Sequence, residues 1–181
     1  RIGEQIEEGL LYHTNYNKEE RKQKVLELIK QVGIPNAERV VRRFPHELSG
    51  GMRQRVIIAI ALSCKPDVLI CDEPTTALDV TIQAQILDLI RKLKEEIEAG
   101  IILITHDLGV VSEMADRVAV MYAGEIVEIA PVNELFLNPK HPYTRSLLSS
   151  IPQLDKETEH LHVIQGTVPS LKNLPRNGCR F

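Results

Sequence analysis

An acidic pair, Asp72-Glu73, directly follows a short apolar run from Val68 to Cys71. A continuous apolar run of this length is typical of a parallel strand buried on both faces, and ligands bind at the carboxyl ends of such strands. Because Pro74 blocks helix formation here, we expect both carboxylates to lie on a loop. The pattern favours phosphoryl-transfer chemistry, in which the Asp orients Mg²⁺ and the Glu polarises an attacking water. Two solvated acids at a strand end are the alternative interpretation of this pattern alone.

A histidine follows the next apolar run in the chain. The run from Ile101 to Ile104 ends in Thr105-His106-Asp107. If the two runs are neighbouring parallel strands, their carboxyl ends lie at the same edge of the sheet, and His106 meets Asp72 and Glu73 there. A histidine in such a place is more often a hydrogen-bonded filler, but the neighbouring acidic pair favours a catalytic role.

The third candidate is a glycine-containing segment, Leu48 to Arg55, at the predicted start of a helix. Ser49, Gly50 and Gly51 at a helix N-terminus expose several unpaired backbone N–H groups, and the positive end of the helix dipole adds to them. Together these features favour phosphate binding. The alternative interpretation is a glycine-rich loop in which Ser49 only caps the helix.

The elements before these residues are predicted to be helical. Apolar residues at helical spacing predict helices from Ile2 to Leu10, from Asn17 to a stop at Gly33, and from Asn36 to about Arg43. Asn17 with Glu20 three residues later is the pattern of a reciprocally capped helix start. A further apolar helix, from about Gly51 to Ser63, carries the glycine-containing segment.

The elements around the two apolar runs predict a parallel sheet. Between them lies a long amphipathic segment, Ile82 to Ile97, with Gly100 as the expected helix stop. Strand, helix and strand at this spacing imply a right-handed crossover. The remaining predictions are short helices from Leu108 to Ala115, Val132 to Leu137 and Pro142 to Ser150, a hairpin of Arg117 to Tyr122 with Ile126 to Ala130, and a strand from Leu161 to Gln165.

Taken together, these elements resemble the ATP-binding-cassette (ABC) ATPases. The resemblance is carried by the signature motif Leu48-Ser49-Gly50-Gly51, the Walker B segment from Val68 to Glu73, the following loop Thr76-Ala77-Leu78-Asp79, and the switch histidine His106. It implies an α/β fold, with an ABC-type P-loop ATPase core whose partial parallel sheet is flanked by helices. The implied parts are a helical subdomain with the signature helix (1–63), the Walker B and switch-histidine part of the core (64–130), and a C-terminal extension (131–181).

The resemblance also implies a role for each motif. In this family two subunits sandwich two ATP molecules, and the signature motif of one subunit contacts the γ-phosphate held by the other. Carried over, Asp72 would orient Mg²⁺ through water, Glu73 would be the general base, and His106 would contact the γ-phosphate. Asp79 would link the two sites across the dimer. The implied nucleotide-binding residues are Ser49, Gly50, Gly51, Gln54 and Asp79.

A narrower resemblance points to the ATPase subunits of oligopeptide/dipeptide importers. It is carried by the segments Phe44 to Leu48, Asp72 to Val80, His141 to Thr144 and Gly166 to Leu171, and by Met52, where most cassette proteins carry Gln. It implies a subunit at the cytoplasmic face of the cell membrane that couples ATP hydrolysis to peptide import. The implied partners are transmembrane permease subunits, a second ATPase subunit in a homo- or heterodimer and, indirectly, an extracytoplasmic peptide-binding protein.

Composition limits the alternatives. The 181 residues are 43% hydrophobic and 26% charged, which excludes collagen-like, fully disordered and membrane-spanning chains. The formal net charge of −3 argues against nucleic acid as a partner. An importer of nickel, other metal chelates or sugars, and a non-transport ABC ATPase acting on nucleic acid, are the remaining interpretations.

The three cysteines are too few and too scattered for a disulfide framework or a complete metal site. Cys64 and Cys71 lie in apolar runs and are expected to be small buried hydrophobic residues. The resemblance implies further cysteines beyond Phe181, sometimes linked to an iron–sulfur cluster, but Cys179 alone supports no such assignment.

The family's phosphate-binding loop is not found in this sequence. That loop ends in Lys followed by Ser or Thr, and no Lys here is followed by either. The chain also begins at Arg1 rather than Met, so we expect it to be a C-terminal portion of a cassette ATPase, without the Walker A and glutamine loops. The chain alone is therefore expected to bind no ATP measurably, since the backbone N–H groups and lysine for the phosphates are lost. Micromolar binding in a calorimetric titration would contradict this expectation.

Overall fold

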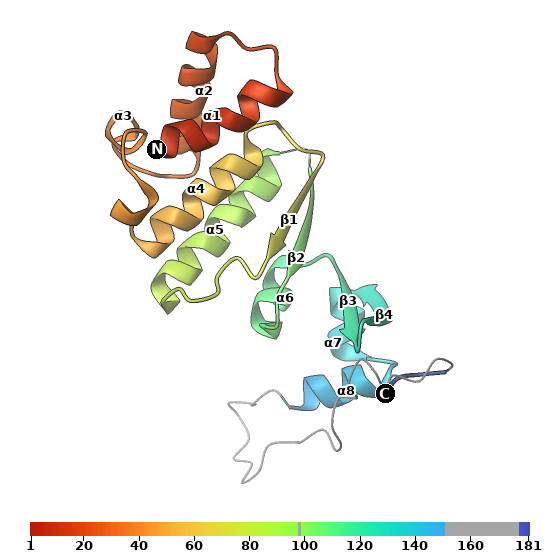
Figure 1. Ribbon diagram of the computed structural model, residues 1–181. Coiled ribbons are helices and arrows are strands. Elements are labelled where there is room, and N and C mark those ends of the chain that lie inside the picture. The colour runs from red at the N-terminus through yellow and green to blue at the C-terminus, as the bar shows by residue number, and fades with distance from the viewer. Residues whose placement is uncertain (98, 151–177) are drawn as a thin grey trace. The chain divides into compact units, whose positions relative to one another are not determined.

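The computed structural model describes residues 1–97, 99–150 and 178–181, and the chain divides into two compact units, Arg1–His106 and Asp107–Phe181 (Figure 1). All of the candidate site residues lie in the first unit. The predicted strand from Leu161 to Gln165 and the segment from Gly166 to Leu171 lie outside the described residues. The three-part division inferred from sequence stays a prediction.

The first unit begins with four α-helices predicted from sequence and a 3₁₀ turn, η1, that was not predicted. They are α1 (Ile2–His13), α2 (Lys18–Gln31), the single turn α3 (Ala37–Val40), the 3₁₀ turn η1 (Pro45–Glu47) and α4 (Gly50–Leu62). Helices α1, α2 and α4 contact one another through apolar side chains that are almost fully buried. This core contains Ile2, Ile6, Leu10, Val25, Leu28, Ile29, Val32, Val56, Ala59 and Leu62. The third helix is shorter than predicted, because the α-helix ends at Val40 and the next residues, Val41 and Arg42, form a turn.

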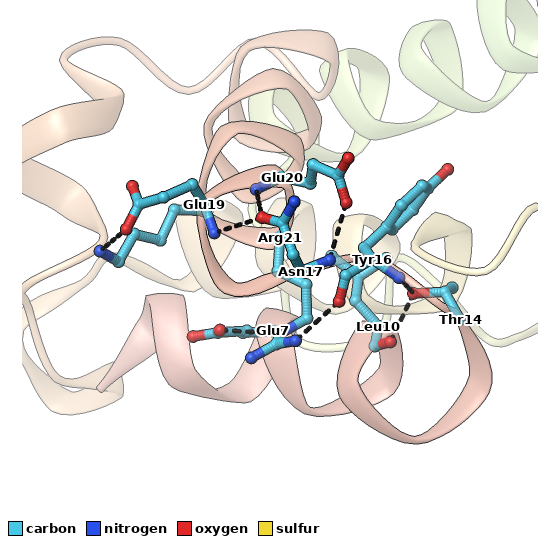
Figure 2. Close-up of polar contacts among 9 residues, drawn as sticks. Glu7, Leu10, Thr14, Tyr16, Asn17, Glu19, Glu20 and Arg21 are labelled. Atoms are coloured by element: carbon cyan, nitrogen blue, oxygen red, sulfur yellow. Dashed lines mark hydrogen bonds and ion pairs between the residues drawn. The ribbon is translucent and has the colours of Figure 1, made fainter.

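The corner between α1 and α2 confirms the predicted capping (Figure 2). Asn17 Oδ1 accepts a hydrogen bond from the Glu20 backbone N–H at 3.1 Å, and Glu20 Oε2 accepts one from the Asn17 backbone N–H at 2.7 Å. Arg21 closes the corner: its Nε donates to Glu7 Oε1 at 3.0 Å and its Nη1 to the Tyr16 carbonyl at 2.8 Å. The start of α2 is thus fixed to α1 by reciprocal capping and by one partly buried ion pair.

The predicted parallel sheet is confirmed. Strand β1 (Val68–Asp72) pairs in parallel with β2 (Gly100–Ile104), and helix α5 (Val80–Glu96) connects them. Helix α5 buries Ile86, Leu89, Ile90 and Leu93 and lies beside α4 (Figure 1). Alternate residues of a strand point to opposite faces of the sheet.

The expectation that these strands are buried on both faces is wrong. Leu69 and Cys71 are buried, whereas Val68, Ile70, Ile102 and Ile104 are 52%, 63%, 50% and 47% exposed. The strands therefore have one covered and one open apolar face, since the helices of this unit pack on one side only. The sequences of β1 and β2 show that both of their faces are apolar, but not which face other elements cover.

Three further expectations differ from the structure. Asp72 is the last residue of β1, paired in register with Ile104, so only Glu73 of the acidic pair lies on the loop. Helix α5 ends at Glu96, because Ile97 is already extended, and Gly100 opens β2 rather than stopping the helix. Cys64 is exposed, since it follows the end of α4, whereas Cys71 is buried as predicted.

The second unit contains α6 (Leu108–Met114), β3 (Arg117–Tyr122), β4 (Glu125–Pro131), α7 (Val132–Leu137) and α8 (Pro142–Ser149). The antiparallel pairing of β3 with β4 confirms the predicted hairpin. Its turn residues Ala123 and Gly124 have φ of +47° and +83°. Two successive positive φ angles suit the right-handed twist of the hairpin strands. In the described part of the chain, no helix is long and apolar enough to cross a bilayer.

Glu128 on β4 anchors the start of α8. Its two carboxylate oxygens accept the backbone N–H groups of Lys140 and His141 at 2.7 and 3.0 Å. Partial burial raises the pKa of this carboxyl, but the hydrogen bonds that it accepts outweigh burial, so its pKa lies below the ordinary value. The stabilisation from the ionised form is complete above the ordinary pKa and is lost as the pH falls through the lowered pKa.

Glu128→Gln is therefore expected to loosen α8, because the neutral amide accepts hydrogen bonds more weakly and offers only one acceptor oxygen. We expect the Arg145 amide, which donates to the His141 carbonyl at 3.1 Å, to exchange with solvent about tenfold faster. Amide hydrogen exchange followed by NMR measures this effect. Glu134→Gln on α7, an exposed carboxylate, is the matched control, and equal exchange in the two variants would refute the anchoring role.

Candidate functional site

The carboxyl ends of β1 and β2 bring Glu73 and His106 together. His106 Nδ1 lies 2.7 Å from Glu73 Oε1, and Thr76 Oγ1 donates to Glu73 Oε2 at 2.7 Å. The Glu73 backbone N–H donates to the Ile104 carbonyl at 2.9 Å, so the loop after β1 is tied directly to the last residue of β2. The meeting of Glu73 with His106 was expected from the parallel strand order.

The charge on Glu73 fixes the place of one proton of His106. An ionised carboxylate can only accept hydrogen bonds, so His106 Nδ1 carries the proton in this contact. The side chain of His106 is 84% exposed and that of Glu73 is 41% exposed. Both groups can therefore reach a ligand from solvent, and each has a partner that orients it.

The hydrogen bonds also shift the acidity of Glu73. The bond from Thr76 and then the bond from His106 lower the pKa of the Glu73 carboxyl below its ordinary value, against a smaller effect of burial. The carboxylate is therefore ionised throughout the neutral range. Its contribution to stability is present above the ordinary pKa and is lost as the pH falls through the lowered pKa.

Thr76→Val is expected to raise the pKa of Glu73 toward its ordinary value, because valine keeps the shape of threonine and removes the hydroxyl donor. An NMR titration of the side-chain carboxyl carbon in the chain and the variant measures this shift. Thr75→Val, at the neighbouring threonine of the same loop, is the control. A Glu73 pKa that is the same in Thr76→Val as in the unmodified chain would show that the hydroxyl does not set the acidity.

The backbone of Glu73 adopts a conformation that side-chain-bearing residues rarely adopt. Its φ is +44°, in the left-handed region that favours glycine. The bond to Ile104 and a bond from the Thr76 N–H to the Glu73 carbonyl, 3.1 Å long, hold it there. Non-glycine residues in this region cluster at functional sites. The strand pattern alone gives no sign of this conformation.

A second group of candidate residues lies at the start of α4. Ser49 caps the helix through a 3.4 Å bond from the Met52 N–H, and Asp79 caps α5 through a 3.0 Å bond from the Ile82 N–H. The two helix starts touch: a Cβ on Gly51 would lie 2.5 Å from Ile82 Cγ2, closer than packed atoms allow. Glycine at position 51 therefore permits the close approach of α4 to α5. The capped N-terminus of the 13-residue helix α4 offers backbone N–H groups and a positive dipole end to an anion.

The remaining predicted site residues lie close to these groups in the chain. Asp72 shares the exposed face of β1 with Val68 and Ile70, and Gln54 lies half-buried on α4. Sequence reasoning assigned no separate role to Thr76 or to Ile82. The three-residue spacing from Glu73 to Thr76 could have indicated the first, since a turn brings such residues together. The contact between Gly51 and Ile82 joins residues far apart in the chain and leaves no local pattern.

The described residues fit a Mg²⁺ ion that is held mainly by water and substrate phosphates and takes one carboxylate from the protein. No three histidine, cysteine or carboxylate side chains gather as a metal site within the described ranges. Mg²⁺ usually keeps several waters and takes one or two protein carboxylates together with substrate phosphates. Asp72, exposed at the end of β1, can supply such a carboxylate.

Comparisons with known proteins bear on the family and the fold. The family model "ABC transporter" matches residues 2–76, and the model "oligopeptide/dipeptide transporter, C-terminal region" matches residues 127–181. A solved structure described as a dimeric bacterial ABC transporter cassette is 32% identical, with a TM-score of 0.62, over 72% of this chain and 56% of that chain. The fold is thus that of an ABC ATPase cassette.

Several curated proteins are similar over nearly the whole chain. The oligopeptide transport ATP-binding protein AppD of Bacillus subtilis is 60% identical over 99% of this chain and 55% of its own length. OppD of Lactococcus lactis subsp. cremoris is 61% identical over 96% and 52%, and AmiE of Streptococcus pneumoniae is 58% identical over 94% and 48%. The chain spans about half the length of the curated relatives it matches.

Proposed function

Because this chain belongs to the ABC transporter ATP-binding proteins that carry the oligopeptide/dipeptide C-terminal region, we propose that the whole protein hydrolyses ATP to drive peptide import. By the whole protein we mean a protein that contains both this chain and the nucleotide-binding segment of its longer relatives. The observation that carries the proposal is the contact of Glu73 with His106 at the carboxyl ends of two parallel strands.

In the proposed hydrolysis, Glu73 and His106 have separate roles. Glu73, ionised at neutral pH, accepts a proton from the attacking water, and the hydrogen bonds from Thr76 and His106 orient its carboxylate. His106 donates its Nδ1–H to Glu73, so Nε2 is the ring atom that contacts the γ-phosphate, and Nε2 must carry a proton to donate to a phosphate oxygen. Asp72 would hold Mg²⁺ through water, and a bound Mg²⁺ would supply positive charge beside the phosphates.

The start of α4 serves a second nucleotide. Ser49, Gly50 and Gly51, with Gln54 on the same helix, present hydroxyl and backbone N–H groups that suit phosphate oxygens. In the proposed dimer this surface contacts the ATP held by the other ATPase subunit. Asp79 caps α5 beside the start of α4, and this position supports the proposal that it links the two sites across the dimer.

The proposed setting is the cytoplasmic face of the cell membrane. The partners are transmembrane permease subunits and a second, identical or related, ATPase subunit, while an extracytoplasmic peptide-binding protein acts indirectly. The match of residues 127–181 to the oligopeptide/dipeptide C-terminal region favours peptides over sugars or metal chelates. The net charge of −3 disfavours a nucleic-acid-directed ATPase.

The test is Mg²⁺-dependent ATP hydrolysis by the purified whole protein, together with identification of its co-purifying subunits. We expect hydrolysis that is lost on removal of Mg²⁺ by a chelator, and co-purification with membrane permease subunits. Co-purification with nucleic acid, or absence of hydrolysis in the reconstituted complex, would refute the proposal.

A further inference from the structure

Arg55 connects the signature helix to the end of α2. It lies on α4, and its Nη1 donates a 2.6 Å hydrogen bond to the carbonyl of Val32, the residue that caps the C-terminus of α2. Carbonyl groups at a helix end have no partner within their own helix. The negative end of the helix dipole also attracts a cation. The guanidinium therefore meets both the hydrogen-bonding and the charge preference of this helix end.

The residue after Val32 makes room for this arginine. Gly33 has a φ of +73°, and a Cβ built there would lie 2.9 Å from Arg55 Nη1. A side chain at position 33 would thus strain the backbone and displace the guanidinium from the Val32 carbonyl. The turn after α2 is shaped to receive Arg55.

The same guanidinium reaches a third helix. Arg55 Nη2 lies 3.5 Å from Gln85 Oε1 on α5, a hydrogen bond at the upper limit of length. Nearer the start of α4, Gly51 packs against Ile82, also on α5. Helix α4 thus has two points of attachment. Its first turn packs on α5 through Gly51, and Arg55 bonds it to the end of α2 and to α5.

We propose that Arg55 is a positioning residue for hydrolysis, which fixes the direction in which the signature motif presents Ser49 and the following N–H groups. It acts through α4 and does not itself touch the nucleotide. Arg55 is six residues from Ser49, about 9 Å along the helix axis, so a small tilt of α4 at Arg55 moves the helix start. The proposal rests on the proposed ATPase function, and it implies that a displacement of α2 reaches the signature motif through the Arg55–Val32 bond.

The first test uses the chain itself and needs no nucleotide. Arg55→Ala is expected to speed amide hydrogen exchange at Arg53, whose N–H donates to the Ser49 carbonyl at 2.9 Å, by about tenfold. Arg55→Lys, which keeps a donor for Val32, should recover most of the protection. The Ile97 amide, bonded to Leu93 at the far end of α5, should be unchanged, and Arg91→Ala, an exposed arginine on α5, should change neither amide.

The second test uses the whole protein. In Arg55→Ala we expect kcat to fall about tenfold while KM changes less than about threefold, because the signature motif acts after ATP has bound. Arg55→Lys should restore most of kcat. An unchanged kcat in Arg55→Ala, or an equal rise in exchange at Arg53 and Ile97, would overturn the positioning role. If the unmodified whole protein hydrolyses no ATP, the proposed function fails, and the exchange measurement on the chain still decides whether Arg55 fixes the start of α4.

Discussion

In the whole protein, Glu73→Gln is expected to leave ATP bound and to lower turnover at saturating ATP by about 100-fold or more. The glutamine amide keeps the size of the side chain and still accepts the hydrogen bond from Thr76. It has no basic carboxylate for the attacking water, so chemistry is lost while binding remains. Steady-state hydrolysis together with equilibrium binding of ATP measures the two effects separately.

The control for this variant is Glu95→Gln, the same substitution at an exposed carboxylate on α5. We expect turnover in that variant to match the unmodified protein. Near-normal turnover in Glu73→Gln would remove Glu73 from the role of general base. Loss of ATP binding in Glu73→Gln would instead show that the carboxylate supports the nucleotide site and not the chemical step.

Gly51→Ala is expected to lower the free energy of unfolding of the chain, because adding a methyl group to a filled interior usually costs about 1–3 kcal/mol. The new Cβ would lie 2.5 Å from Ile82 Cγ2, a branched methyl group that cannot swing aside like the end of a long side chain. Replacing glycine by alanine within a helix gains about 0.5–1 kcal/mol, so the expected net loss is at most about 2.5 kcal/mol. Urea denaturation followed by circular dichroism measures the difference.

Two further variants test the mechanism of this loss. Gly50→Ala should be close to neutral, because its Cβ would meet only the terminal Leu78 Cδ2 at 3.3 Å. The double variant Gly51→Ala with Ile82→Ala should lose less stability than the sum of the two single variants, because each change makes room for the other. Strictly additive losses would show that contact between α4 and α5 is not the reason for glycine at position 51.

The parts of the fold that follow local patterns could be predicted from sequence. Apolar spacing predicted α1, α2, α4 and α5, and Asn17 with Glu20 predicted the capped start of α2. The parallel order of β1 and β2 followed from their apolar runs and the helix between them. That order was enough to bring Glu73 and His106 together, because it depends on topology and not on side-chain detail.

The parts that depend on distant contacts could not be predicted. The bond of Arg55 to Val32 and the packing of Gly51 on Ile82 join separate helices, and no periodicity marks either pair. The end of α5 was placed too late, because Gly100 resembles a helix stop but serves as the first residue of β2. Whether a face of the sheet is buried depends on which other elements pack against it. The apolar sequence of β1 therefore could not show that Ile70 is exposed.

At Glu73 the left-handed backbone favours glycine, whereas the proposed chemistry needs a carboxylate. Glycine would adopt a φ of +44° without steric conflict, whereas glutamate is held there by its neighbours. Glycine at position 73 would relieve this steric conflict, and it would remove the proposed base and its bonds to Thr76 and His106 in the same step. In laboratory evolution, this position is one where selection for folding alone and selection for turnover would choose different amino acids.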